Sequence, residues 1–168
     1  MRSTVADVIL LCGKIGCGKT TYAQKLCRTH KAVNLSVDEI MLEIFGQDAG
    51  EKHDAYTAAI KQYLLQKAVE LVGCGVTVIL DWGFWSKRSR DEVKAFFSER
   101  SIGCRIYYFD LPDTIWKRRI EKRNADLSAG KVQAYYVDEG LAAKCEAMFE
   151  APCRDEVDVC IDEEGGFI

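Results

Sequence analysis

The residues with the clearest chemistry form one stretch near the N-terminus, Gly13-Lys14-Ile15-Gly16-Cys17-Gly18-Lys19-Thr20, which fits the pattern G-x-x-x-x-G-K-[ST]. It directly follows an apolar, strand-like run and directly precedes a helical pattern, the context that a phosphate-binding loop (P-loop) requires. Its glycines let backbone N–H groups point at phosphate oxygens, and the start of the helix adds a positive dipole end. The pattern therefore predicts a nucleotide site, in which Lys19 reaches the β- and γ-phosphates and Thr20 holds Mg²⁺.

The whole loop is expected to bind the nucleotide, through Gly13, Ile15, Gly16, Cys17, Gly18, Lys19, Thr20 and Thr21. A glycine-rich turn without a ligand is the alternative, and the agreement of motif with context counts against it. A GTPase would carry N-K-x-D, but Asn124 is followed by Ala125-Asp126. Large mechanochemical ATPases normally need a longer chain than 168 residues, so small-molecule or nucleotide kinases fit best.

Asp38 follows the second strand-like run, at the edge of a parallel sheet where ligands bind. It could accept the proton of an acceptor hydroxyl, or hold that hydroxyl in line with the γ-phosphate. The alternative is a helix-start acid favoured by the helix dipole. Ser36 with Glu39 already explains that helix start as a capping box, which favours the functional interpretation of Asp38.

Asp81 ends the third strand-like run, and an apolar strand that ends in Asp is typical of a Mg²⁺-binding Walker B carboxylate. Aromatic residues follow it at once. They could line a substrate pocket or cap the sheet, and the sequence leaves both open for Trp82, Phe84 and Trp85.

Arg119 and Arg123 are four residues apart and so share a helix face. They precede a glycine-centred segment, about 124–136, that we expect to act as a lid. Arginines delivered there would neutralise charge on the transferring phosphoryl group while the lid excludes water. A solvated basic face paired to Glu121, or a patch for an anionic substrate, is the alternative.

The basic residues beside the two lid arginines, and those that follow the aromatic residues 82–85, are expected at the surface. Arg118 and Lys122 point elsewhere on the helical wheel from the two lid arginines. Arg88 and Arg90 are surface residues by default, and of the two Arg90 is the candidate for touching substrate.

The elements that position these groups alternate between strands and helices. The apolar pattern predicts strands over 7–12, 32–35, 76–80, 105–109 and 157–161, and helices over 19–29, 37–46, 55–72, 86–100, 112–124 and 138–149. Near-continuously apolar strands between helices indicate an α/β protein with a parallel sheet covered on both faces. No linker or repeat interrupts the pattern, so we expect one domain over residues 1–168.

Composition excludes several function classes. The net charge of −3 argues against sequence-independent duplex binding, and no apolar run approaches the roughly 20 residues of a membrane span. Residues 1–4 lead straight into a strand without the features of a signal peptide, and the eight cysteines include no C-x-x-C pair. We therefore expect a cytoplasmic protein with mostly buried, reduced thiols and, since His30 and His53 are isolated, no zinc site.

The motifs together resemble the small P-loop kinases of the AAA_33 and zeta-toxin-like group. The matching stretches are 13–20, 36–40, 80–85, Arg119 and Arg123-Asn124. Chloramphenicol phosphotransferase and the phage polynucleotide kinase domain are similar more distantly. The resemblance implies a three-layer P-loop NTPase fold with five parallel strands in the adenylate-kinase-like order 2-3-1-4-5, and ATP as donor. It also implies that Asp38 acts on the acceptor hydroxyl and that Arg119 and Arg123 contact phosphates.

Two departures from the motifs of related kinases narrow the range of acceptor classes. Polynucleotide kinases carry a basic residue shortly after the aspartate, where this chain has Glu39-Ile40-Met41-Leu42. The adenylate kinase pattern D-G-F-P-R is only half met by Asp81-Trp82-Gly83-Phe84. Nucleic-acid ends and nucleoside monophosphates are therefore less favoured.

The leading hypothesis is an ATP- and Mg²⁺-dependent phosphotransferase that acts on a small hydroxyl-bearing acceptor. Asp38, Lys19, Arg119 and Arg123 would be its catalytic residues, and Thr20 with Asp81 would hold the metal. The loop 47–54 and the long helix after it would form one wall of the acceptor site. A nucleotide or nucleic-acid 5′-end kinase, and a non-catalytic ATP-binding regulatory module, are the alternatives.

Overall fold

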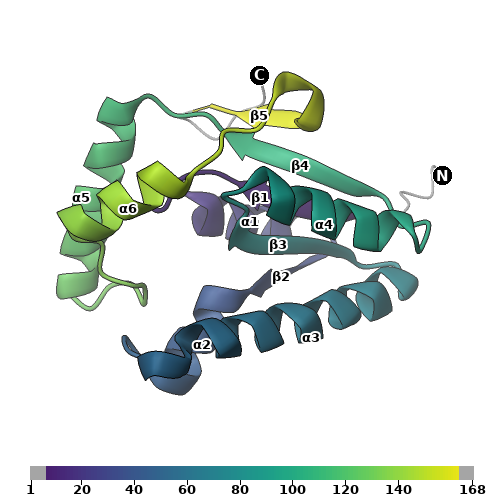
Figure 1. The fold of residues 1–168 in the computed structure, drawn as a ribbon, viewed down its shortest axis with the longest axis horizontal. Coiled ribbons are helices and arrows are strands. Elements are labelled where there is room, and N and C mark those ends of the chain that lie inside the picture. Colours follow the sequence, from purple (N-terminus) through teal and green to yellow (C-terminus); the bar gives the residue numbers. More distant parts are fainter. Residues whose placement is uncertain (1–6, 163–168) are drawn as a thin grey trace.

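Five parallel strands form the centre of the molecule in this computed structural model, which describes residues 7–162 (Figure 1). They lie in the order β2-β3-β1-β4-β5, and every pairing between neighbours is parallel. The strands are β1 (Val8–Cys12), β2 (Ala32–Ser36), β3 (Thr77–Gly83), β4 (Cys104–Phe109) and β5 (Val159–Ile161). This confirms the expected α/β class and the strand order that the resemblance implied.

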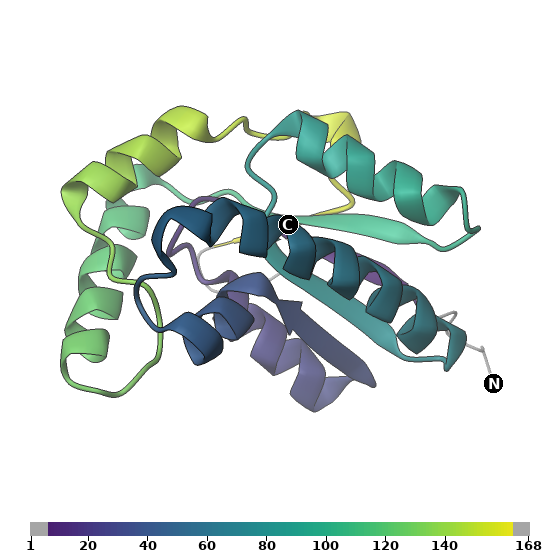
Figure 2. The same cartoon turned by 60° about the horizontal axis from the view of Figure 1, so that its bottom comes forward.

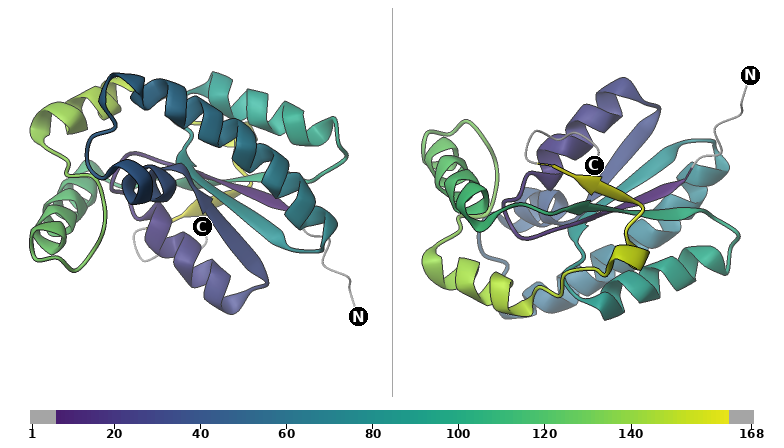
Figure 3. Two further views of the ribbon diagram at one scale, coloured as in Figure 1. Left: turned by 90° about the horizontal axis from the view of Figure 1, so that it is seen from below. Right: turned by 90° about the horizontal axis from the view of Figure 1, so that it is seen from above.

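Helices connect the strands and cover both faces of the sheet. They are α1 (Lys19–Thr29), α2 (Val37–Phe45), α3 (His53–Gly73), α4 (Lys87–Ser98), α5 (Asp113–Ser128) and α6 (Glu139–Met148). Seen from below in Figure 3, α3 and α4 lie on one side of the sheet and α1 on the other. The expected three layers are therefore present.

The alternation of side chains along β1 explains this layering, because successive residues of a strand point to opposite faces. Val8, Leu10 and Cys12 belong to the core cluster that contains residues of α3 and α4. Ile9 and Leu11 belong to the cluster that contains residues of α1 and α5. All five are at most 5% exposed, so β1 is fully buried and holds the loop that follows it in place.

Most predicted boundaries agree with the structure to within two or three residues, and two differences bear on the site. β3 continues to Gly83, because it still pairs there with Cys12 of β1, so Asp81 lies within the strand. α5 continues to Ser128 and not to about residue 124, because no helix breaker occurs before Gly130, whose φ of 68° ends it. The lid-like segment predicted at 124–136 therefore becomes a loop over 129–138.

Two further expectations can be compared with the structure, and a third concerns residues that it does not describe. No helix within residues 7–162 is long and apolar enough to cross a membrane. The eight cysteines are all unpaired, but only Cys12, Cys17 and Cys145 are buried, so the expectation of mostly buried thiols is wrong for this chain. Residues 1–4, from which we expected no signal peptide, lie outside the described residues.

Candidate active site

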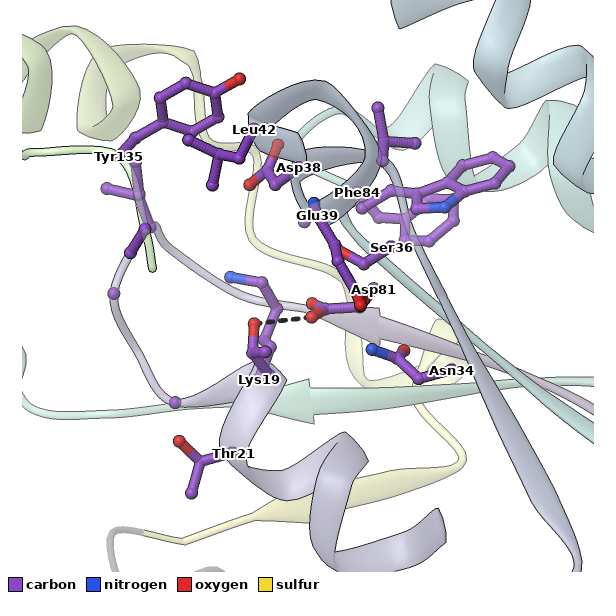
Figure 4. A pocket seen from close by; sticks show the side chains of 18 of the residues that line it. Lys19, Thr21, Asn34, Ser36, Asp38, Glu39, Leu42, Asp81, Phe84 and Tyr135 are labelled. Atoms are coloured by element: carbon purple, nitrogen blue, oxygen red, sulfur yellow. Dashed lines mark hydrogen bonds between the residues drawn. The ribbon is translucent and has the colours of Figure 1, made fainter. Parts of the chain in front are cut away.

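The predicted site residues meet at the carboxyl edge of three adjacent strands (Figure 4). The P-loop follows β1, Asp38 lies in the first turn of α2 directly after β2, and Asp81 lies near the end of β3. They line one cleft of about 2010 Å³. Ligands bind at this edge of open α/β sheets, so the fold places the candidate groups where the sequence analysis expected them.

The P-loop wraps tightly because two of its glycines adopt left-handed backbone conformations. Gly16 has a φ of 73° and Gly18 a φ of 105°. A Cβ on Gly18 would lie 2.9 Å from Nη1 of Arg119, so a larger residue would displace that arginine. The Lys19 side chain folds back on the loop, and its ammonium donates to the carbonyl oxygens of Gly13 (3.0 Å) and Lys14 (2.8 Å). It therefore lies at the centre of the loop.

The other loop residues divide into two groups. Those that line the cleft are Ile15, Gly16, Gly18, Lys19, Thr20 and Thr21. Cys17 is buried, and its thiol packs against Gly13, where a Cβ would lie 2.7 Å from the sulfur. Gly13 and Cys17 can therefore serve a nucleotide only through their backbone.

Lys14, for which the sequence suggested no role, ties the loop to the helices beyond it. Its ammonium pairs with Asp113 of α5 (2.9 Å) and with Glu146 of α6 (3.1 Å). These hydrogen-bonded ion pairs raise the pKa of Lys14, although its partial burial opposes them. The interactions hold α6 against the phosphate-binding loop.

Thr20 and Asp81 form the candidate metal site. The Thr20 hydroxyl donates a 2.6 Å hydrogen bond to Oδ2 of Asp81, a carboxylate that is only 6% exposed. A hydroxyl and a carboxylate are hard oxygen ligands, the kind Mg²⁺ takes from a protein when substrate phosphates and water complete its shell. No cluster of three or more His, Cys, Asp or Glu suited to a metal occurs among residues 7–162. The residues present therefore fit Mg²⁺.

Asp38 is exposed to the solvent of the cleft, although the protein around its carboxyl partly desolvates it (Figure 4). That surrounding raises the pKa of its carboxyl, and the negative charge of Asp81 raises it further. The positive charges of Lys19, Arg123 and Lys61 oppose this rise. A carboxylate with a raised pKa is a better proton acceptor at neutral pH than an ordinary surface aspartate.

Arg119 and Arg123 both reach the site from α5. Arg119 donates to the Cys17 carbonyl of the P-loop. Arg123 is half-buried, donates to the Tyr135 carbonyl at 3.3 Å, and is electrostatically coupled to Asp38 and Asp81. Burial lowers the pKa of Arg123, while these two carboxylates raise it. The two arginines thus lie over the loop and the carboxylates, and the neighbouring Arg118 and Lys122 are exposed as expected.

The segment 129–138 is fastened to the body of the protein by two side-chain amides. Asn124 of α5 donates to the Val137 carbonyl (2.6 Å) and accepts from the Val137 N–H (3.1 Å). Gln47, in the turn between α2 and α3, donates to the Ala134 carbonyl (2.8 Å) and accepts from the Tyr136 N–H (3.4 Å). Figure 2 shows the segment that joins α5 to α6 beside this turn. The second pair of bonds therefore joins two segments that both line the cleft.

The aromatic residues after Asp81 serve both the pocket and the packing. Trp82, Phe84 and Trp85 all line the cleft. Trp82 stacks on Phe84 with ring centroids 5.6 Å apart and donates through Nε1 to the Leu35 carbonyl at 2.9 Å. Phe84 is 4% exposed and adopts a left-handed φ of 47°, which is unusual for a bulky residue.

Arg90 holds this strained turn in place, and its expected surface position is wrong. It is fully buried, and its guanidinium donates to the carbonyls of Phe84 (3.1 Å) and Glu150 (2.9 Å). Its Nε also pairs with Glu156 at 3.0 Å. Arg90 is therefore a structural residue that fixes the aromatic segment, while Arg88 is exposed as expected.

The cleft includes residues that the sequence analysis did not single out. Lys61 of α3, Asn34 of β2 and Tyr135 of the segment 129–138 all line it. Asn34 offered a signal, because asparagine is depleted in strands. Lys61 and Tyr135 offered none, since each reaches the site only through tertiary packing.

The comparisons with known proteins agree with this geometry. The AAA_33 family profile, described as an AAA domain, matches residues 8–148. A comparison with curated protein sequences finds no match.

Solved structures share the fold at low sequence identity. A candidate kinase from Chloroflexus aurantiacus J-10-fl aligns with a TM-score of 0.69 and 17% identity, over 95% of this chain and 89% of that chain. The Pnkp1/Rnl/Hen1 RNA repair complex contains a chain with a TM-score of 0.69 and 21% identity, over 86% of this chain and 44% of that chain. The Mycobacterium tuberculosis APS kinase CysC, solved with AMPPNP and APS, aligns with a TM-score of 0.62 and 20% identity, over 94% and 88%. The chain therefore has the fold of P-loop kinases.

Proposed function

The chain belongs to the AAA_33 family of AAA domains, and on this premise we propose that it is an ATP- and Mg²⁺-dependent phosphotransferase. It transfers the γ-phosphoryl group of ATP to a hydroxyl of a small acceptor. The observation that carries the proposal is the meeting of Thr20, Asp81 and Asp38 at the carboxyl edge of the sheet. A protein that only binds a nucleotide needs the first two residues but has no use for an acid in the position of Asp38.

Each site residue has its own role in the proposed phosphoryl transfer. The P-loop backbone and Lys19 bind the β- and γ-phosphates, and Arg119 and Arg123 balance the charge that spreads over the transferring group. Thr20 and Asp81 hold Mg²⁺, which when bound neutralises phosphate charge. Asp38 positions the acceptor hydroxyl in line with the γ-phosphate and takes its proton as the new O–P bond forms. The bond between the γ-phosphorus and the bridging oxygen breaks in the same step, and ADP leaves with that oxygen.

A nucleotide or nucleic-acid 5′-end kinase is the second candidate. The fold shared with a chain of an RNA repair complex, with a TM-score of 0.69, favours it. The residues that follow Asp38 oppose it, because Glu39, Ile40 and Met41 provide no cation for a nucleic-acid phosphate. A small acceptor is therefore the first choice.

The test is an ATP-consumption screen with Mg²⁺ over nucleosides, nucleotides, aminoglycosides, phenicols, sugars and short 5′-hydroxyl oligonucleotides. Asp38→Asn is run beside the wild type as the matched control. A signal that depends on one acceptor and disappears in the variant supports the proposal and identifies the acceptor class. Binding of ATP with no consumption over the whole panel would contradict it and favour a regulatory module.

A further inference from the structure

One face of α3 presents hydrogen-bond donors to the cleft. His53, Thr57 and Lys61 follow one another at intervals of four residues, so they lie along one side of the helix. All three line the cleft. Trp82 and Phe84 provide aromatic surface in the same cleft. The part of the cleft next to Asp38 therefore combines a donor-bearing helix face with aromatic side chains.

Two donors of this face, those of Thr57 and Lys61, make no hydrogen bond within the described residues, whereas the His53 ring pairs with Asp54 at 3.3 Å. The Lys61 ammonium makes no hydrogen bond or ion pair with any residue in the described part of the chain, and it lies over the Trp82 ring, 6.0 Å from the ring centroid. The Thr57 hydroxyl oxygen is buried and has no hydrogen-bond partner within residues 7–162. Buried polar groups are normally satisfied, so the unpartnered Thr57 hydroxyl points to a ligand, and the unpaired Lys61 ammonium lies one turn away from it.

The charge of Lys61 selects the kind of ligand. Lys61 is half-buried, and burial lowers the pKa of its ammonium, while the negative charge of Asp38 raises it. A cationic ligand would add repulsion to a charge that is already poorly solvated. An anionic ligand would relieve the cost of that burial by charge-assisted hydrogen bonds.

We propose that the acceptor carries an anionic group, a phosphate or a carboxylate, besides its reacting hydroxyl, and that Lys61 and Thr57 bind that group. This inference rests on the proposed function and names the class of its acceptor. The anionic group binds to α3 at one end of the acceptor, while Asp38 binds the reacting hydroxyl at the other. Polycationic acceptors such as aminoglycosides are disfavoured for the same reason.

The competing explanation is that Lys61 only balances the charge of Asp38. The two side chains are coupled through space, but no ion pair joins them among the described residues. A purely balancing lysine would not bind an added anion. Anion binding with the P-loop already filled therefore separates the two explanations.

The experiment is a calorimetric or NMR titration at constant ionic strength of protein saturated with a non-hydrolysable ATP analogue and Mg²⁺. Inorganic phosphate and glycolate are the two anionic probes, and ethylene glycol is the neutral counterpart of glycolate. The wild type should bind one of the anions and not ethylene glycol, and the tighter anion identifies phosphate or carboxylate as the group. Lys61→Met should weaken that binding about tenfold or more, because a charge-assisted hydrogen bond contributes roughly 1.5–3 kcal/mol. Lys61→Arg should restore most of it.

Lys67→Met is the matched control, since Lys67 lies on the same helix, is exposed and pairs with Glu70. It should leave anion binding unchanged. Lys61→Met removes a poorly solvated charge, so the variant should fold, and circular dichroism checks that it does. If the analogue binds but neither anion does, or if Lys61→Met binds the anion as well as the wild type, the inference is overturned. Failure of the analogue to bind would instead overturn the proposed function.

Discussion

The hydroxyl of Thr20 and the carboxylate of Asp81 lie 2.6 Å apart although 61 positions separate them in the chain. The parallel pairing of β1 with β3 brings them together. Thr20 lies in the first turn of α1, directly after the P-loop that follows β1, and Asp81 lies in β3. The two oxygen ligands that we propose for Mg²⁺ thus come from two separate sequence motifs.

Asp81→Asn should therefore reduce the contribution of Mg²⁺ to nucleotide binding. The amide keeps the size of the side chain but removes the negative charge that attracts the metal. ATP affinity in Mg²⁺ should fall toward the affinity measured in EDTA, and turnover should fall by about 100-fold or more. Calorimetry with and without Mg²⁺ measures the first effect. An Asp81→Asn protein with wild-type Mg²⁺ dependence would show that this carboxylate is not a metal ligand.

Lys19→Ala should abolish turnover and weaken binding of the nucleotide phosphates. Lys19 provides the ammonium at the centre of the loop, where it now contacts the carbonyls of Gly13 and Lys14. Lys117→Ala, which removes an exposed charge of α5, is the control for the loss of a lysine. Competition by ATP and ADP against a fluorescent analogue gives the affinities. Full activity in Lys19→Ala would refute the assignment of the P-loop.

Asp38→Asn should leave ATP affinity near that of the wild type and cut turnover by roughly 10²–10⁴-fold. The carboxylate must be ionised to accept a proton, and its pKa is raised by the surrounding protein and by Asp81. The rate of the wild type should therefore fall as the pH is lowered through that raised pKa, above the ordinary value of 3.8. The variant should lack this limb of the pH–rate profile. The same limb in both proteins would assign it to another group.

The raised pKa also has a consequence for stability. A carboxyl whose pKa is higher in the folded than in the unfolded state binds its proton more tightly when folded. Its stabilising contribution is complete below the unfolded pKa and is lost as the pH rises through the folded pKa. Asp38→Asn should thus have a higher Tm than the wild type at neutral pH, with the difference shrinking toward pH 3.8. A difference that does not vary with pH would contradict the raised pKa.

The sequence predicted those parts of the site that local pattern encodes. The P-loop is one contiguous motif, Asp38 follows a helix cap made by Ser36, and Asp81 ends an apolar run. The Ser36 hydroxyl accepts from the Glu39 N–H at 3.3 Å, as the capping box predicts. The second bond of the box, from the Ser36 N–H to the Glu39 side chain, does not occur among the described residues. The strand order came from the resemblance, because apolar periodicity alone gives elements and not their neighbours.

Long-range packing explains what could not be predicted. Arg90 lies in a helix rich in charged residues, where an arginine is by default expected at the surface. Its burial depends on the ion pair with Glu156, which lies 66 positions away in the chain. The sequence predicts the loop 47–54 and the helix after it as one wall of the acceptor site, but no motif singles out Gln47 or Lys61 within them. Their roles depend on how α2, α3 and the segment 129–138 meet across the cleft.

Arg90→Met should destabilise the protein by about 3 kcal/mol or more. It removes the cation that pairs with the largely buried carboxylate of Glu156 and the donor that Arg90 gives to the carbonyls of Phe84 and Glu150. The bonds from the Cys153 N–H to Glu156 and from the Cys12 thiol to Phe84 replace only part of this. Chemical denaturation measures the free energy of unfolding. Arg88→Met is the control two residues away, since its side chain is 88% exposed, and it should unfold like the wild type. Equal stabilities of the two variants would show that the Arg90 network contributes little.

Asn124→Ala should loosen the segment 129–138 without changing the P-loop. The substitution removes both hydrogen bonds to Val137, each of which contributes about 1 kcal/mol. The amide of Val137 should then exchange its hydrogen about tenfold faster or more, because its acceptor Oδ1 is gone. Gln133→Ala, an exposed position in the same segment, should leave that exchange unchanged. If Val137 stays equally protected in Asn124→Ala, the segment is held by the burial of Val137 in the core, at 2% exposure, and not by the amide.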